Sequence, residues 1–117
     1  MTMNPYIIPG ILPPPVLPKN GSASLLDILE MAAVAFSVPV EDLMNRNRRQ
    51  ACVFARHAFC LAARTSTGKS TLKIGRVISR NHATVLNSLK AANLMIETNY
   101  RDFTRNFEKI KESLNID

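Results

Sequence analysis

The sequence predicts an all-α domain of the helix-turn-helix type, with about five or six helices behind a disordered, proline-rich N-terminal leader. Apolar residues recur at three- and four-residue spacings in several stretches, as on one face of an α-helix, and no stretch alternates as a strand would. Six of the seven prolines lie within residues 1–20. Because 117 residues suffice for a single hydrophobic core, we divide the chain into a flexible leader at 1–22 and one helix-turn-helix domain at 23–117.

The leader combines many prolines with many apolar residues. Proline fixes φ and lacks a backbone donor, so we expect this segment to be extended or disordered. The prolines interrupt its apolar run and its start is not basic, which argues against a signal peptide and against a membrane span. Together with the free thiols expected for Cys52 and Cys60, this predicts a cytoplasmic protein. Docking of the apolar leader onto a protein partner is an alternative role for this segment.

Two helices are expected before the central part of the chain. Ser24 and Asp27 form a capping-box-like start for the first helix, which should end before Pro39. Its apolar stripe consists of Leu25, Ile28, Leu29, Ala32 and Phe36. Residues 37–43 are typical of a short second helix, with Pro39 in its first turn and acidic residues near its positive end.

A basic loop at residues 46–49 leads into a long helix from about Arg49 to Arg64. The expected inward face of this helix consists of Val53, Phe54, Ala58, Leu61 and Ala62. Cys52 and Cys60 lie about 12 Å apart along such a helix, which is too far for a disulfide, so both should be free thiols. Residues 65–69 then connect to the next helix.

Residues 70–90 are expected to fold as two helices joined by a tight turn. Ser70 is a good N-cap for the first of them, whose inward residues would be Leu72, Ile74, Val77 and Ile78. The second helix should begin near Asn81, with its apolar face formed by Val85, Leu89, Ala92 and Ile96. This pattern alone fits a purely structural helical hairpin as well as a recognition helix. A last helix after Thr98 is indicated by Phe103, Phe107, Ile110 and Leu114.

The distribution of charge favours a nucleic-acid-binding function. The formal net charge is +6, and ten of the fifteen Lys and Arg residues lie between Leu43 and Ile96, where there is no Asp or Glu. A span of this length without acidic residues predicts a broad positive field. Nucleic acid is the first partner to consider and an anionic membrane the second, while a merely solvated basic face is the remaining alternative.

The sequence gives little reason to expect an enzyme, a cofactor or a metal site. Residues 66–70 end like a phosphate-binding loop, but the first glycine of that motif would have to stand where Ala63 is, and no apolar strand precedes it. The sequence places no Ser or Cys as an activated partner of His57 or His82. For His82 the nearest acid, Glu97, lies about four turns away. No group of Cys and His has the spacing of metal ligands.

From about Leu26 to Leu114 the chain resembles the C-terminal DNA-binding domain of the bacterial chromosomal replication initiator DnaA, its domain IV, a Trp-repressor-like helix-turn-helix. That family carries an Arg-Asp-His-Thr-Thr-Val signature, which reads here Arg-Asn-His-Ala-Thr-Val at residues 80–85. Ser70, Ile74 and Gly75 match the preceding helix. The resemblance implies double-stranded DNA as the partner, and it places Arg48 at the position of the basic loop that enters the minor groove. The turn after Gly75 is one residue shorter than in the family and lacks its usual glycines.

The departures at two base-reading positions predict a related but shifted DNA site. Asn81 stands where the family has Asp, and an amide can pair in bidentate fashion with adenine. Ala83 stands where the family has Thr and keeps a methyl group that can contact thymine. The expected base contacts are made by Arg48, Asn81, His82, Ala83 and Thr84. The expected phosphate contacts are made by Arg46, Arg49, Lys69, Ser70, Lys73 and Arg80.

We therefore interpret the chain as a sequence-preferring DNA-binding protein, associated with the nucleoid, that acts in replication control or transcriptional regulation and has the replication machinery as a further partner. The family's initiator has an ATPase module ahead of this domain, where we expect only the leader. The alternative function is a protein-interaction adaptor, in which the leader recruits a replication or transcription protein.

Overall fold

The computed structural model describes residues 24–100 and 102–114, and this part of the chain is entirely helical, without a strand. The six helices are α1 (Leu25–Ala35), α2 (Val40–Met44), α3 (Gln50–Thr67), α4 (Thr71–Val77), α5 (His82–Glu97) and α6 (Phe103–Leu114). The predicted all-α class and the number of helices are thus confirmed. The predicted leader at residues 1–22 lies outside the described residues. No helix within the described ranges is both long enough and apolar enough to cross a membrane.

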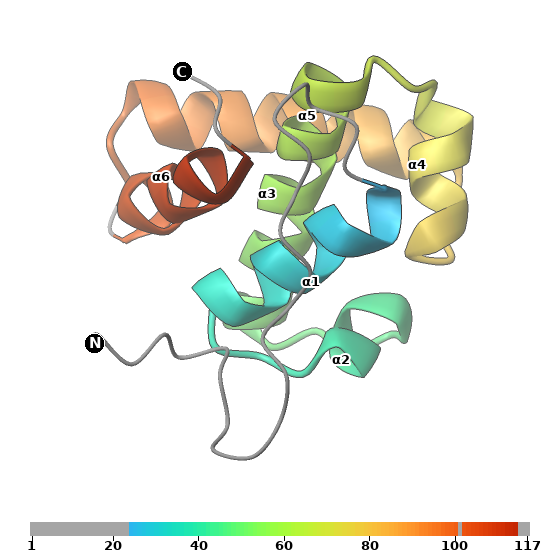
Figure 1. Cartoon of the computed structure of the whole chain (residues 1–117), viewed down its shortest axis with the longest axis horizontal. Helices are drawn as coiled ribbons and strands as arrows, with labels where there is room; N and C mark the ends of the chain where they lie inside the picture. Colours follow the sequence, from blue (N-terminus) through green and yellow to red (C-terminus); the bar gives the residue numbers. More distant parts are fainter. Residues whose placement is uncertain (1–23, 101, 115–117) are drawn as a thin grey trace.

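Helix α3 is the centre of the fold, and each of the other five helices packs against it. Figure 1 shows α5 along one edge of the molecule, with α4 near the start of α5 and α6 near its end. The buried side chains of α3 are mostly small, which lets its neighbours approach closely. They are Cys52, Ala55, Arg56, Ala58, Phe59, Cys60, Ala62 and Ala63. Both cysteines are free thiols, as predicted.

The predicted inward face of α3 is only partly correct. Ala58 and Ala62 are fully buried, but Val53, Phe54 and Leu61 are only partly buried. A single amphipathic stripe is the pattern of a helix with one covered face, whereas α3 is covered from several directions. Val53, Phe54 and Leu61 therefore lie at the margin of the core, whereas Phe59 is fully buried. The helix also continues beyond the expected end at Arg64, to Thr67, and Gly68 caps it in a left-handed conformation with φ 66°.

The capping box at the start of α1 is confirmed. The Ser24 hydroxyl accepts a hydrogen bond from the Asp27 amide, and the Asp27 carboxylate accepts one from the Ser24 amide, both at 3.1 Å. The short second helix begins later than predicted, because Pro39 is its N-cap and lies outside its first turn. Residues 37 and 38 instead close the end of α1, where the Val38 amide donates to the Ala33 carbonyl at 2.9 Å.

The predicted start of α4 is confirmed, since the Ser70 hydroxyl accepts a hydrogen bond from the Lys73 amide at 3.2 Å. The inward position predicted for Leu72 is wrong, because this residue is 49% exposed. Leu72 lies two positions before Ile74, and residues two apart on a helix do not share a face. Of the other residues predicted on that face, Ile74 and Ile78 are buried and Val77 is partly buried. On α6 the four residues of the predicted stripe, Phe103, Phe107, Ile110 and Leu114, are all buried, as expected.

Candidate nucleic-acid interface

The turn between α4 and α5 is closed by backbone hydrogen bonds that return to the end of α4. The Arg80 amide donates to the Gly75 carbonyl at 2.8 Å, and the Ser79 amide donates to the Arg76 carbonyl at 3.3 Å. Ser79 has φ 57°, a left-handed conformation in which helix ends usually have glycine. A side chain at Gly75 would collide with the Arg80 carbonyl oxygen. The glycine therefore allows the start of α5 to lie directly against α4.

The first turn of α5 exposes three of the four residues predicted there as base contacts. Asn81, His82 and Ala83 are exposed, while Thr84 is partly buried. Asn81 caps the helix, because its Oδ1 accepts a hydrogen bond from the Thr84 amide at 2.9 Å. A bidentate contact with adenine would need this same oxygen as an acceptor. While the cap is in place, the Asn81 Nδ2 group is left as a hydrogen-bond donor.

The basic loop has a defined conformation in the structure. The Asn45 Oδ1 accepts a hydrogen bond from the Asn47 amide at 2.7 Å, and the Asn47 Oδ1 accepts one from the Arg49 amide at 2.9 Å. Such side chain to backbone bonds stabilise turns. Arg46 and Arg48 are exposed within this loop. Arg49 forms an ion pair with Asp42 at 2.9 Å, so an acid already partly compensates its charge.

A buried arginine that the sequence analysis did not single out holds the start of this loop. Arg56, on α3, is 7% exposed. Its Nε donates to the Leu43 carbonyl at 3.0 Å, and its Nη2 donates to the carbonyls of Asp42 and Asn45 at 2.6 and 3.0 Å. The pKa of Arg56 is lowered from its ordinary value, mainly by burial and to a smaller extent by the nearby charge of Arg80. Its burial could have been inferred from the sequence, because Arg56 lies midway between Cys52 and Cys60 and therefore on the same side of the helix.

Arg80 connects the turn before α5 to the basic loop. Its Nη2 donates to the Asn45 carbonyl at 2.8 Å, and its Nη1 donates to the carbonyls of Ile78 and Ser79 at 3.0 and 3.3 Å. Asn45 immediately precedes Arg46, so this contact brings the basic loop next to the turn before α5. Two segments that are 35 residues apart in sequence thus form one surface.

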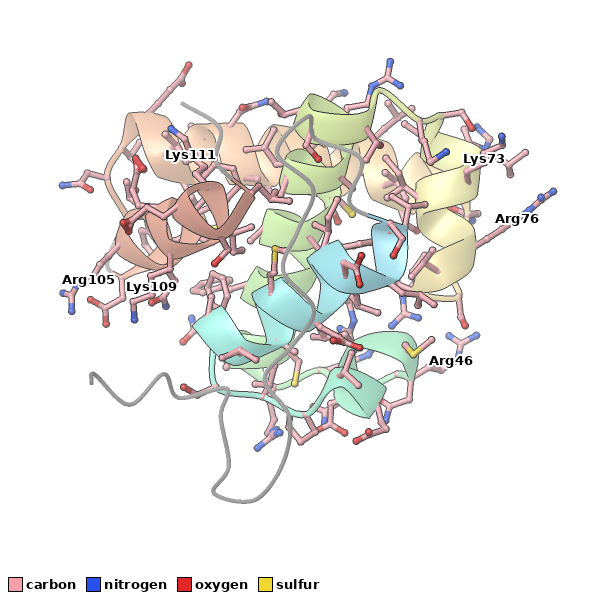
Figure 2. All side chains as sticks on the ribbon, viewed as in Figure 1. Arg46, Lys73, Arg76, Arg105, Lys109 and Lys111 are labelled. Carbon is pink, nitrogen blue, oxygen red and sulfur yellow. The ribbon has the colours of Figure 1, made fainter. Side chains whose placement is uncertain are left out.

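Helix α4 contributes further positive charge near this surface. Lys73 and Arg76 are both exposed, and Figure 2 shows them on the same side of the molecule as Arg46. Arg76 was not among the predicted contacts, although its place three residues after Lys73 indicates the same helix face. Lys69 and Ser70 are exposed just before α4. The labelled cations of α6, namely Arg105, Lys109 and Lys111, lie at the opposite end of the molecule.

Helix α3 carries two further titratable side chains, Cys60 and His57, away from the basic loop and the first turn of α5. Burial raises the pKa of the Cys60 thiol to about 12, against a smaller opposite effect of its hydrogen bond with Ser88. His57 is a partly buried residue of α3. Its pKa is lowered mainly by burial and to a smaller extent by the charge of Arg56. Within the described ranges, no three His, Cys, Asp or Glu side chains are grouped so that they could hold a metal ion.

Comparison with known proteins gives a consistent match to one family. Residues 26–91, more than half of the chain, match the family model described as the bacterial DnaA protein helix-turn-helix. Over 102 residues the chain is 30% identical to the chromosomal replication initiator protein DnaA 1 of Chlamydia pneumoniae, and the match covers 86% of this chain. Over 71 residues, or 61% of this chain, it is 35% identical to the chromosomal replication initiator protein DnaA of Desulfotalea psychrophila. The chain spans 22% and 15% of the lengths of these two relatives.

Proposed function

Because the chain belongs to the family of the bacterial DnaA protein helix-turn-helix, we propose that it binds double-stranded DNA with sequence preference in the context of replication. The observation that carries this proposal is the joining of the basic loop to the start of α5 by Arg80, within a span that has no acidic residue. The activity is binding, without catalysis and without a cofactor. Replication control and transcriptional regulation are both compatible with such binding, and we assign the protein to the nucleoid.

In this proposal the first turn of α5 enters the major groove. With its oxygen engaged in the cap, Asn81 offers a donor, which suits the acceptor atoms of guanine, thymine or adenine in that groove. The exposed ring of His82 and the exposed methyl of Ala83 lie beside it on the same turn. The methyl group suits the methyl of thymine. Thr84 is partly buried and contributes at the edge of this contact.

The basic loop and α4 are assigned to the DNA backbone and the minor groove. Arg48 is exposed and carries a planar cation, which suits the negative potential of a narrow A·T minor groove. Phosphate contacts are assigned to Arg46, Arg49, Lys69, Ser70 and Lys73, and Arg76 joins them. Ser70 accepts the Lys73 amide through its oxygen, so its hydroxyl hydrogen is available for a phosphate oxygen. Among these residues Arg49 should contribute least to DNA affinity, because its ion pair with Asp42 already compensates part of its charge.

Binding should weaken strongly with salt. If about five phosphates are neutralised, the logarithm of the association constant should fall with the logarithm of the salt concentration with a slope of about −4 to −5. Lys73→Ala should weaken binding to all sequences alike and make the slope shallower by about one. The measurement is a fluorescence-anisotropy titration of duplex DNA at several salt concentrations.

The matched control for this titration is Lys109→Ala, on α6 at the opposite end of the molecule (Figure 2). This variant removes the same charge from an exposed position of a helix and should leave the slope unchanged. A slope near zero for the unaltered protein would refute the proposed mode of binding. Equal changes of the salt slope in Lys73→Ala and Lys109→Ala would show that the DNA contacts are not confined to α4, the basic loop and the start of α5.

A further inference from the structure

We propose that Arg80 is a positioning residue that fixes the basic loop relative to the first turn of α5, and that it is not primarily a phosphate contact. The inference rests on the proposed function, because it concerns how two DNA-contacting segments are held together. Its basis is the set of three backbone carbonyls that the Arg80 guanidinium holds, those of Ile78, Ser79 and Asn45. Two of these belong to the turn and the third belongs to the residue before the loop.

The Asn45 carbonyl is the point at which the position of the loop is set. It accepts hydrogen bonds from two arginines, Arg56 at 3.0 Å and Arg80 at 2.8 Å. Arg56 attaches it to α3, and Arg80 attaches it to the turn before α5. The side chain of Asn45 then accepts the Asn47 amide and starts the folded conformation of the loop. Moving this residue would therefore move Arg46 and Arg48, the exposed cations that follow it.

The chemistry of these contacts requires arginine. A guanidinium is planar and carries donors in several fixed directions, so it can hold carbonyls that lie apart from one another. A lysine ammonium is a compact group on a flexible stem and cannot reproduce that fork. Arg80 also lies close enough to Arg56 for its charge to lower the pKa of that residue. Two cations are held side by side by neutral carbonyls, and among the described residues no acid forms an ion pair with either of them.

The functional consequence concerns the simultaneous use of two grooves. A loop that must reach the minor groove while α5 occupies the major groove needs a fixed separation from α5. Without Arg80 the loop would have to be ordered during binding, and the loss of conformational entropy would reduce affinity. The number of phosphates contacted would not change. Affinity should therefore fall without a change in the salt dependence.

The test is Arg80→Lys, which keeps the charge but not the planar guanidinium. It is compared with Arg105→Lys, the same exchange at an exposed position on α6, at the opposite end of the molecule (Figure 2). In the free protein, amide hydrogen exchange at Asn47 and Arg49 should become faster in Arg80→Lys only, because these amides donate within the loop. Duplex affinity should fall about tenfold, as for the loss of one charge-assisted hydrogen bond, with the salt slope of the unaltered protein. Arg105→Lys lies outside the proposed DNA contacts and should resemble the unaltered protein in both measurements.

Two outcomes would overturn the inference. If Arg80→Lys binds DNA like the unaltered protein and its loop amides exchange at the same rate, Arg80 does not position the loop. If affinity falls while loop exchange stays the same, Arg80 acts directly on DNA. A failure of the proposed function would appear differently, since the unaltered protein would then not bind duplex DNA. The exchange measurement on the free protein would still show whether Arg80 holds the loop.

Discussion

Replacing Gly75 with alanine should lower the free energy of unfolding by about 2 kcal/mol, through overpacking of the tight turn after α4. The new methyl group would collide with the Arg80 carbonyl oxygen, and it would lie 3.1 Å from Cγ2 of Val85. Alanine favours a helix over glycine by about 1 kcal/mol, but this gain is smaller than the cost of moving backbone atoms in a closed turn. The measurement is urea denaturation, with amide chemical shifts of residues 78–84 as a report on the turn.

Gly68→Ala is the matched control, because Gly68 lies in a left-handed conformation with nothing within 4 Å of an added methyl group. It should cost about 1 kcal/mol, from the backbone conformation alone, and leave residues 78–84 undisturbed. Under conditions in which both variants are folded, only Gly75→Ala should lose DNA affinity. Equal effects of the two variants on stability and on the turn would contradict the role assigned to Gly75.

Arg56→Met should lower the free energy of unfolding by about 2 to 3 kcal/mol. Methionine approximates the length of arginine but donates no hydrogen bond, so the carbonyls of Asp42, Leu43 and Asn45 lose a charged donor. Replacing both sides of a buried polar contact by apolar groups can be neutral, but here the backbone carbonyls remain. Denaturation of the variant should show the loss, and exchange of the loop amides should become faster.

Arg64→Met provides the comparison on the same helix. Arg64 also donates to backbone carbonyls, those of Gly68 and Lys69, but it is exposed and water can replace it. Its replacement should change the free energy of unfolding by less than about 0.5 kcal/mol. A loss as large as that of Arg56→Met would mean that burial of the Arg56 contacts does not determine their contribution.

The elements that were predictable from the sequence depend on local patterns. Ser24 and Ser70 are caps because their side chains reach amides three residues later, and this relation is visible in the sequence. The stripe of α6 was correct because that helix buries one face. The predicted face of α3 was only partly correct, because several neighbours surround this helix and periodicity then gives no single direction. Leu72 was assigned inward for its apolar character, although its spacing from Ile74 argues against it.

The candidate site was predictable in its charge and less so in its geometry. The acid-free span indicated a basic surface, and the structure joins the basic loop to the start of α5. Arg56 and Arg80 hold backbone carbonyls up to 14 and 35 residues away, and no local pattern reveals such partners. Likewise, the sequence places Asn81 at the start of a helix, but only the structure shows that its oxygen is taken by the cap.

In the proposed mode of binding, the first turn of α5 reads bases while α4 contacts the DNA backbone. The most direct measurement is a competition assay across all single-base variants of a DNA site selected from random duplexes. It should compare His82→Ala, Asn81→Ser, which retains a capping oxygen, and Lys73→Ala. The first two should each lose about 1 to 3 kcal/mol of discrimination at one or two base pairs, whereas Lys73→Ala should weaken every sequence alike. An even loss over all variants for His82→Ala and Asn81→Ser would contradict the claim.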